Sequence, residues 1–275
     1  MIWIKRIILQ FISTIKKFIL GKFAEAILYK DKSNFFYLVD VDDMVVGRKL
    51  AYDGINESQM IQDVNGFINE QSTVVILGTH VGTLLIPLST KVKSIYGFEA
   101  NPTTFKLLEM NLLLNNIKNA QIYNVAIGNK SGQIDFYANK LNSGGSKIKP
   151  ENDSFYKRFD LPNTIQVEVT PLDSYFHKYE TIDLLLVDIE GGEYNALKGM
   201  TNTLKKVSVL QIEYVPRHLK YISNVDNKEF FSLIMPYFKR FKIVDSLPVY
   251  DIDQIFGILD SYWKNNLGCD IIFFK

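Results

Sequence analysis

Apolar residues change their spacing along the chain, and each spacing predicts a different kind of structure. In residues 1–33 they recur at helical intervals with lysine and arginine on the opposite face, which predicts a basic amphipathic helix. Residues 34–71 hold β-rich runs divided by Asp-Asp and closed by Asp-Gly, and then a helical pattern. They predict a strand pair and a helix that lead into the core. From residue 72 to residue 275, short apolar runs alternate with helical segments, as in an α/β domain.

The strands of this last region are apolar on both faces. The runs are "TVVILG", "SIYGFEA", "IDLLLVDIE" and "VSVLQIEYV", and a final strand is expected at "CDIIFFK". Strands of this kind between helices predict a parallel sheet that is covered on both sides. Near residues 129–170 two strand-like runs enclose a polar stretch rich in Gly, Ser, Asn and Pro. A loop of this length inside a compact domain indicates a functional insertion.

Composition narrows the class of protein. The chain has 275 residues, of which 47% are hydrophobic and 22% charged, as is typical of a soluble globular protein. Its net charge of +1 gives no electrostatic case for a nucleic-acid partner. The single cysteine, Cys269, excludes an intrachain disulfide and a cysteine-rich zinc site, and it fits a reducing compartment. We therefore expect a cytoplasmic protein without a nucleic-acid partner.

The N-terminal segment could contact several kinds of surface. A lysine pair divides its apolar stretch, which makes it too short and too charged to span a bilayer. No small-residue cleavage site follows, which argues against a signal peptide. Because amphipathic helices usually face a core, packing on the body or on a second subunit is favoured. The alternative is peripheral contact of residues 2–28 with an anionic membrane surface, at the inner face of the membrane.

The stretch "VVILGTHVGTL" predicts a strand, a glycine loop and the start of a helix. Gly78 and Gly82 let the backbone approach a ligand closely, although their spacing matches neither the dinucleotide nor the phosphate-loop pattern. Glu99 ends the next predicted strand, where a carboxylate can accept hydrogen bonds from both hydroxyls of a ribose. Together these features favour an adenosine-containing cofactor over an ordinary loop with a solvated acid.

A second cluster, "LLLVDIEGGEY", places acids directly after a buried strand. Asp188 and Glu190 are two residues apart, so strand alternation sends both to the same side. Two close carboxylates can hold a proton or a cation, and this leaves a general base and a metal site both open. Glu193 has a simpler explanation as well, because an acid in the first turn of a helix is favoured by the helix dipole.

Seven segments in chain order resemble one protein family. They are "GINE", "GTHVG", "FEANPTTFKLLEMNLLLNNI", "NVAIGNKSGQIDFY", "NSGGS", "VTPLDSYF" and "VDIEGGEYNALKGM", between about Gly54 and His218. They are similar to motifs of the FkbM-type S-adenosylmethionine-dependent methyltransferases. The resemblance implies an α/β, Rossmann-like class I methyltransferase fold for residues 72–275. Its sheet would be mostly parallel and seven-stranded, with helices on both faces and an antiparallel C-terminal strand.

The resemblance also implies roles for individual residues. S-adenosylmethionine would contact the glycine loop and the two strand ends that follow it, through Gly78, His80, Gly82, Glu99, Asn124 and Ala126. Asp188 and Glu190 would face the methyl group and the acceptor as candidate bases, with or without a divalent cation. His218 is the next candidate base, although it could equally be a surface residue at a helix start. Acceptor contacts are expected from Asn142, Ser146 and Glu193.

The chain departs from the family pattern at two positions. Ile76 stands where family members usually have Asp, and His80 stands where they usually have Asn. Loss of the Asp removes a carboxylate that orients the loop or the amino group of the cofactor. His80 either hydrogen-bonds the methionine half of the cofactor or packs over the loop.

The expected activity is methyl transfer from S-adenosylmethionine to a hydroxyl group. The family implies a sugar, glycan, glycolipid or related natural product as acceptor. Two other classes remain as alternatives. A nicotinamide-dependent oxidoreductase would share the sheet and Glu99, but it would leave "DIEGGE" unexplained. A non-catalytic cofactor-binding module is favoured only by Ile76.

Overall fold

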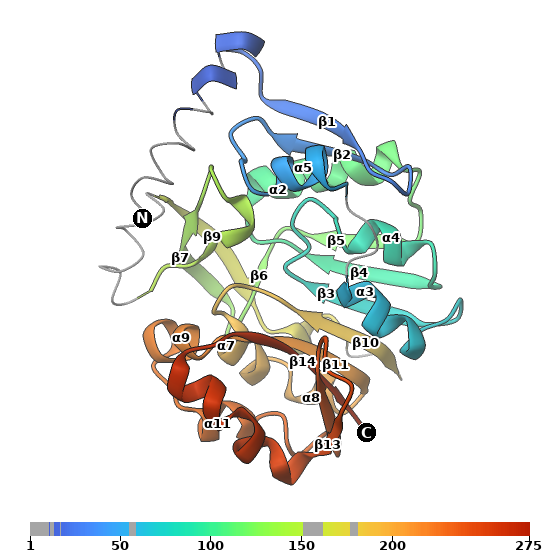
Figure 1. Ribbon diagram of the computed structural model, residues 1–275, viewed down its shortest axis with the longest axis vertical. Coiled ribbons are helices and arrows are strands. Elements are labelled where there is room, and N and C mark those ends of the chain that lie inside the picture. Colours follow the sequence, from blue (N-terminus) through green and yellow to red (C-terminus); the bar gives the residue numbers. More distant parts are fainter. Residues whose placement is uncertain (1–10, 12–13, 17, 55–58, 151–161, 177–180) are drawn as a thin grey trace.

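The structure is a computed structural model that describes residues 11, 14–16, 18–54, 59–150, 162–176 and 181–275. Its centre is a sheet whose described strands follow the order β13-β12-β14-β11-β10-β3-β4-β5 (Figure 1). These strands are β3 (Thr73–Leu77), β4 (Ser94–Phe98), β5 (Ala120–Tyr123), β10 (Ile182–Val187), β11 (Val207–Tyr214), β12 (Arg240–Ile243), β13 (Val249–Asp251) and β14 (Cys269–Phe274).

The topology confirms the predicted fold class. Strands β5, β4, β3, β10 and β11 pair in parallel, whereas β14 is antiparallel to both β11 and β12. The chain builds the sheet outward from β3 to β5, and then returns to β10 and builds in the other direction. Ligands of such sheets bind beyond the carboxyl ends of the strands at this reversal, between β3 and β10.

The described sheet has one strand more than the predicted seven. The addition is β13, which pairs antiparallel with β12 at the edge of the sheet. Three residues are too few to produce a periodic pattern in the sequence, and β13 exists because β12 offers a free edge.

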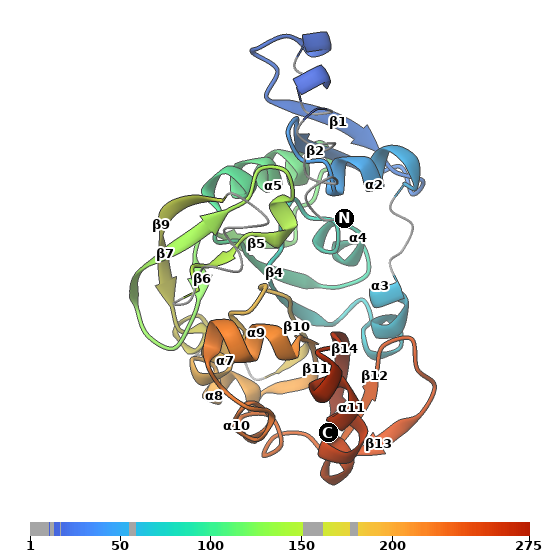
Figure 2. The ribbon, with the colours of Figure 1, turned by 60° about the vertical axis from the view of Figure 1, so that its left-hand side comes forward.

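Both faces of the sheet are buried, as the apolar strands predict. Along β10, Leu184 and Leu186 enter one hydrophobic core, and Leu185 and Val187 enter the other. The first core is covered by α3 (Gln59–Val64), α4 (Leu85–Ser89) and α5 (Pro102–Leu114). The second is covered by α7 (Glu193–Lys198), α8 (Thr201–Leu204), α10 (Asn227–Ser232) and α11 (Ile255–Asn265) (Figure 2).

The predicted insertion forms a second sheet beside the first (Figure 1). Its described strands are β6 (Ala126–Ile127), β7 (Gly132–Ala138), β8 (Lys147–Ile148) and β9 (Asn163–Thr170), and the short helix η2 (Ser143–Gly145) precedes β8. The run "AQIYNVAIG", which predicts one strand, is divided between the two sheets as β5 and β6. At the division the Asn124 amide donates to the carbonyl oxygens of Glu99 and Ala100, so the chain turns there.

The strand pair lies earlier in the chain than predicted. It consists of β1 (Ala26–Lys30) and β2 (Phe36–Asp40), so it crosses the expected boundary between residues 33 and 34. The polar stretch between these strands is their turn, in which the Asp31 carboxylate accepts from the amide of Phe35. The β-rich residues after Asp43 form helix α2 (Val46–Tyr52), because the Asp43 carboxylate caps the amides of Val45 and Val46. The domain boundaries themselves stay a prediction.

Two asparagines, one in α5 and one at its C-cap, attach this hairpin to the main domain. The fully buried Asn111 accepts from the amide of Leu38 at 2.6 Å and donates to its carbonyl at 3.1 Å. One helical turn later, Asn115 does the same with Phe36 at 2.9 and 2.7 Å. An amide side chain offers a donor and an acceptor like a peptide group, so the two residues substitute for a neighbouring strand at the edge of β2.

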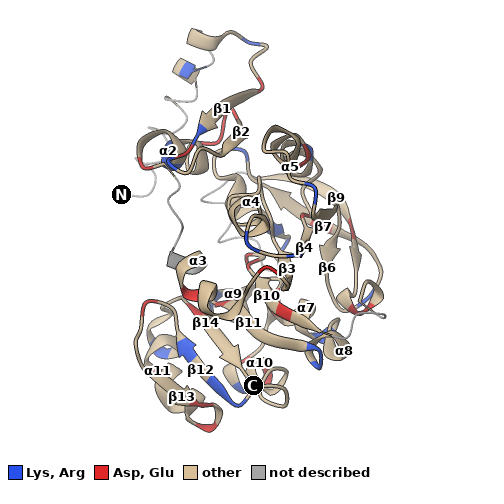
Figure 3. Ribbon diagram, turned by 90° about the vertical axis from the view of Figure 1, so that its right-hand side faces the viewer, with Lys and Arg blue, Asp and Glu red and all other residues tan. Residues whose placement is uncertain are grey.

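Part of the N-terminal segment is described. Residues 14–16 and 18–20 are helical, and Figure 3 shows basic positions on this part of the chain. Apolar side chains here are largely exposed, with 65% of Phe11, 90% of Phe18 and 85% of Phe23 accessible. These side chains therefore do not pack on the body of the protein, which the sequence pattern favoured. Within the described residues, no helix is long and apolar enough to cross a membrane.

Candidate active site

A cavity of about 340 Å³ lies at the strand reversal, beyond the carboxyl ends of β3, β4 and β10. One wall comes from the loop after β3, and another from the segment after β10. The insertion and α2 complete it through Asn142, Ser143, Val45 and Lys49. The end of β4 and residues 125–127 line it as well, so the cavity collects residues from six separate parts of the chain.

The glycine loop after β3 packs directly against the segment after β10. Gly78 has φ +85°, and a Cβ atom there would lie 1.8 Å from the carbonyl oxygen of Asp188. Only glycine fits this contact, and it places the predicted cofactor loop beside the predicted acids. Gly82 does not line the cavity. A Cβ atom there would lie 2.9 Å from Leu108, so its role is to let the loop pack on α5.

Glu99 connects two loops at the edge of the cavity. One carboxylate oxygen accepts from the amide of His80 at 2.9 Å, and the other accepts from the amide of Asn101 at 2.8 Å. Burial raises the pKa of this carboxyl to about 7, against the opposing effect of the two amides. Each oxygen keeps a second lone pair, so the carboxylate can still accept from two hydroxyls of a ligand.

The predicted cofactor contacts Asn124 and Ala126 differ from each other in position. Ala126 lines the cavity together with Val125 and Ile127, and these side chains form an apolar surface. Asn124 is not among the lining residues, because its amide is bonded to the backbone after β4. Asn124 therefore shapes the cavity by holding the chain that surrounds Glu99.

The opposite end of the cavity is acidic. Asp188 and Glu190 both line it. They follow the end of β10 at Val187, and Glu190 has φ +54°, so the turn after the strand, rather than strand alternation, places them there. Burial raises the pKa of Asp188 to about 8, and the charges of Glu190, Glu193 and Asp270 add to the effect. The Nζ atom of the buried Lys147 lies 3.7 Å from Oε2 of Glu190 and partly compensates this negative charge.

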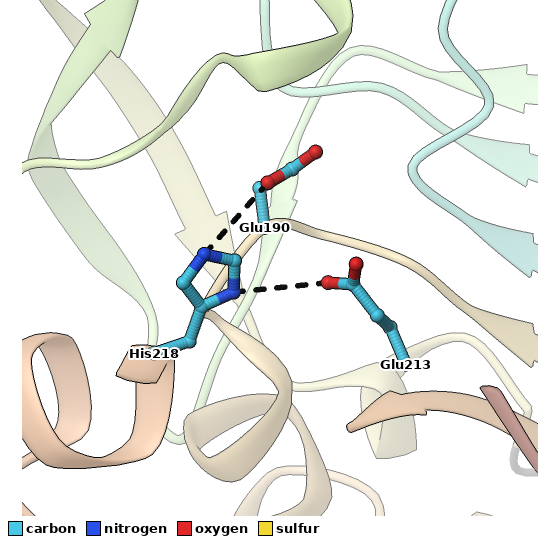
Figure 4. Close-up of side chains that lie close together, drawn as sticks. All are labelled: Glu190, Glu213 and His218. Atoms are coloured by element: carbon cyan, nitrogen blue, oxygen red, sulfur yellow. Dashed lines mark ion pairs between the residues drawn. The ribbon is translucent and has the colours of Figure 1, made fainter. Parts of the chain in front are cut away.

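His218 lies behind Glu190 and does not line the cavity. Figure 4 shows its ring between two carboxylates, with Nε2 3.9 Å from Glu190 and Nδ1 3.7 Å from Glu213. Burial, Lys147 and Arg217 lower the pKa of His218 to about 3, so the ring is neutral at physiological pH. His218 can therefore affect a ligand in the cavity only indirectly, through its contact with Glu190.

The residues predicted to contact the methyl acceptor also differ in position. Asn142 and Ser146 line the cavity. Glu193 does not, because its carboxylate is buried and accepts from the amides of Ile189 and Gly191, both at 3.1 Å. This geometry corrects the prediction of an acceptor contact, since Glu193 stabilises the loop that carries Glu190.

Comparison with known proteins identifies the family. Residues 77–242, more than half of the chain, match the family model described as the methyltransferase FkbM domain. The chain belongs to the FkbM methyltransferase family. The resemblance predicted from the sequence is thereby confirmed, and the methyltransferase class is favoured over the nicotinamide-dependent alternative.

Curated relatives of this FkbM methyltransferase match it over part of their length. The 2-O-methyltransferase NoeI of Sinorhizobium fredii is 33% identical over 111 residues, which cover 36% of this chain and 45% of that protein. The hexuronic acid methyltransferase AglP of Haloferax volcanii is 27% identical over 139 residues, covering 50% of this chain and 53% of that protein. The chain thus spans about half the length of these relatives.

Among solved structures, the methyltransferase FkbM of Methylobacillus flagellatus KT is similar to this chain. The identity is 15%, the TM-score is 0.44, and the match covers 76% of this chain and 46% of that chain.

Residues of the FkbM cavity fit the chemistry of S-adenosylmethionine, the cofactor that methyltransferases use. The apolar surface at Val125–Ile127 suits an adenine ring, and the Glu99 carboxylate suits the two ribose hydroxyls. Asp188 and Glu190 place acidic groups at the far end, where a cationic sulfonium would favour their ionised forms. The lining residues are therefore chemically compatible with this cofactor.

Four residues of the site were missed by sequence analysis. Ser143, Lys147 and Lys49 lie in or beside segments that the motifs marked, but nothing in their spacing indicated a role. Asp43 is fully buried and its carboxylate contacts Ser143, yet in the sequence it only marks a break between β-rich runs. These roles depend on contacts across about one hundred residues, which no local pattern encodes.

The raised pKa of Glu99 predicts a pH-dependent stability. The folded protein without ligand keeps this proton up to about pH 7, whereas the unfolded chain releases it near its ordinary value of 4.5. The free energy of unfolding should therefore fall as pH rises from about 4.5 to 7, by at most about 3 kcal/mol from this group. Denaturant unfolding across this range should show a shallower fall for Glu99→Gln. Glu109→Gln, at an exposed position on α5, should keep the slope, and equal slopes in all three proteins would contradict the prediction.

Proposed function

We propose that this protein transfers the methyl group of S-adenosylmethionine to a hydroxyl of a sugar, a glycan or glycolipid, or a related natural product. The observation that carries the proposal is the single cavity in which Glu99 lines one part and Asp188 and Glu190 line another. The family supplies the reaction class, and the names of the relatives NoeI and AglP favour O-methylation and an acidic sugar.

When bound, the cofactor supplies an activated methyl group. The chain has two tasks, which are to align the acceptor hydroxyl with the carbon–sulfur bond and to receive its proton. We assign the proton to Glu190. Glu190 lines the cavity, and its Oε2 atom lies 3.7 Å from Nζ of Lys147 and 3.9 Å from Nε2 of His218. As the new oxygen–carbon bond forms, the carbon–sulfur bond breaks and the hydroxyl proton passes to Glu190, leaving S-adenosylhomocysteine.

Asp188 has a different role in this scheme. Its pKa of about 8 keeps it protonated at neutral pH, so it can donate a hydrogen bond to the acceptor. Asn142 and Ser146 contribute polar groups on the insertion side of the cavity.

The proposal predicts that cofactor affinity depends on Glu99. Removal of both ribose acceptors in Glu99→Ala should weaken binding of S-adenosylhomocysteine at least tenfold, because hydrogen bonds to a charged group contribute about 1.5–3 kcal/mol. Calorimetry measures the affinity. Glu109→Ala, the same change on the exposed side of α5, should bind as the unaltered protein does.

Methyl transfer should be assayed with hexuronate glycosides and matched neutral glycosides, by following the formation of S-adenosylhomocysteine. A folded protein that binds neither S-adenosylmethionine nor its product would overturn the proposed function.

We further propose that Glu190, Glu213 and His218 bind a divalent cation. Each residue offers one ligand atom, and these atoms lie within 4.8 Å of one another (Figure 4). Burial raises the pKa of Glu213 to about 10, and four neighbouring acids add to the effect. Among the described residues, Oε2 of Glu213 and Nδ1 of His218 are buried without a hydrogen-bond partner. Carboxylate ligands suit Mn²⁺, which serves as the probe ion.

Manganese titration tests the cation. The unaltered protein should bind one equivalent of Mn²⁺, detected by the loss of the free-ion electron paramagnetic resonance signal. Glu213→Gln and His218→Gln should each weaken binding about tenfold or more, as loss of a ligand does. Asp260→Asn on the exposed side of α11 serves as a control for surface charge. Absence of saturable binding, or equal binding by all variants, would exclude the cation.

The N-terminal segment supports a third proposal, which is peripheral contact with an anionic membrane surface. Phe11, Phe18 and Phe23 are exposed on a stretch that also carries Lys16 and Lys22. Exposed aromatic side chains beside lysines are typical of chains that lie in the interface of such membranes.

Vesicle sedimentation tests the membrane contact. The protein should bind vesicles that contain phosphatidylglycerol more strongly than vesicles of phosphatidylcholine alone, and Phe18→Ser should reduce this binding. Leu247→Ser changes an equally exposed apolar side chain outside this segment and should have no effect. Equal binding to both vesicles, or a dimer in light scattering that Phe18→Ser dissociates, would reject membrane contact in favour of a subunit interface.

A further inference from the structure

A chain of hydrogen bonds joins three segments that are far apart in the sequence. Asp43 lies before α2, Ser143 opens η2, and His80 lies in the loop after β3. The Asp43 carboxylate accepts from the Ser143 amide at 3.0 Å and also from the Ser143 hydroxyl. The same hydroxyl oxygen lies 2.5 Å from Nε2 of His80. The connection therefore runs from the N-terminal part of the chain, through the insertion, to the predicted cofactor loop.

These contacts determine where the hydrogen of the His80 ring is. An ionised carboxylate can only accept, so the single hydroxyl hydrogen of Ser143 points to Asp43. The Ser143 oxygen must then act as acceptor toward His80, which places a hydrogen on Nε2. A neutral imidazole has one hydrogen, and Nδ1 is left with a bare lone pair.

The surroundings favour the neutral ring. Burial lowers the pKa of His80, although the negative charge of Asp43 acts in the opposite direction. The backbone of His80 is held as well, because its amide donates to Glu99 in a left-handed conformation with φ +51°. Within the described residues no group is hydrogen-bonded to Nδ1, and His80 lines the cavity. The lone pair is thus an acceptor at a fixed place on the cavity wall.

We propose that Asp43 and Ser143 are positioning residues that lock His80 as the Nε2–H tautomer, so that Nδ1 accepts a hydrogen bond from the α-ammonium group of S-adenosylmethionine. This inference rests on the proposed function. The lone pair repels a carboxylate and attracts an N–H donor, and the α-ammonium is the strongest such donor of the cofactor. Ile76, near the end of β3, is buried in the core and has no polar atom on its side chain that could accept this bond. His80 supplies the acceptor from the neighbouring loop.

The tautomer can be measured without any ligand. Long-range ¹H–¹⁵N correlation spectra distinguish the protonated from the bare ring nitrogen, and only three histidines need assignment. His80 should show the hydrogen on Nε2. Ser143→Ala should yield a mixture of tautomers, whereas Ser131→Ala, at an exposed position, should leave the spectrum unchanged. A hydrogen on Nδ1 in the unaltered protein would overturn the inference.

Two substitutions separate the functions of the ring nitrogens. Asparagine places an amide oxygen at the same bond distance from Cα as Nδ1, and glutamine places an amide nitrogen at that of Nε2. His80→Asn therefore keeps the acceptor for the ligand, and His80→Gln keeps only the donor to Ser143. Each variant is compared by calorimetry for S-adenosylhomocysteine and for methylthioadenosine, which lacks the amino-acid part.

The preference for S-adenosylhomocysteine over methylthioadenosine is the decisive quantity. It should fall about tenfold in His80→Gln and stay within about twofold in His80→Asn, as expected for one hydrogen bond to a charged group. An unchanged preference in His80→Gln would overturn this inference and leave the proposed function intact. Failure of the unaltered protein to bind either ligand would overturn both.

Discussion

The site depends on the buried carboxylate of Glu99. Its two oxygens accept from the amides of His80 and Asn101, which belong to loops after different strands. The interaction fixes the distance between these loops and holds His80 in a left-handed conformation that a non-glycine residue adopts at a cost. The side-chain amide of Asn124, which follows a third strand, donates to the carbonyl oxygen of Glu99 and helps to hold Glu99 in place. These hydrogen bonds of Glu99 determine where the cofactor loop, the apolar wall and the His80 ring lie.

The second feature of the site is the cluster of acidic groups at the far end of the cavity. Asp188, Glu193 and Glu213 all have raised pKa values, because each is buried and each faces other acids. Lys147 lies beside Glu190 and His218 is neutral, so protein charges compensate the cluster only in part. A cationic ligand gains from such surroundings, whether it is a sulfonium in the cavity or a metal ion behind Glu190. The close packing of buried acids lowers the stability of the protein without ligand, and the same packing favours binding of a cationic ligand.

Much of the architecture was predictable because its signals are local. Continuous apolar runs such as that of β10 identify strands that are buried on both faces, and Asn101 with Pro102 marks the start of α5. The hairpin was misplaced for a local reason as well. Asp31 and Asp43 appear in the sequence as polar breaks, whereas one forms a tight turn and the other caps a helix. The three-residue β13 is formed by pairing with β12 and has no pattern of its own.

For the site, the sequence by itself determined which residue types stand at the ends of the strands, and hence Gly78, Glu99, Asp188 and Glu190 as neighbours of one cavity. Parallel strands end at a common edge, and the resemblance to the FkbM family implied that these residues share one site. Only the tertiary structure decided how each side chain is used. It directs Glu193 to backbone amides, places His218 behind Glu190, and brings Asp43 to Ser143 and His80. Such contacts join segments that are far apart in the sequence and close together only in the folded protein. The local spacing of residues therefore does not predict them.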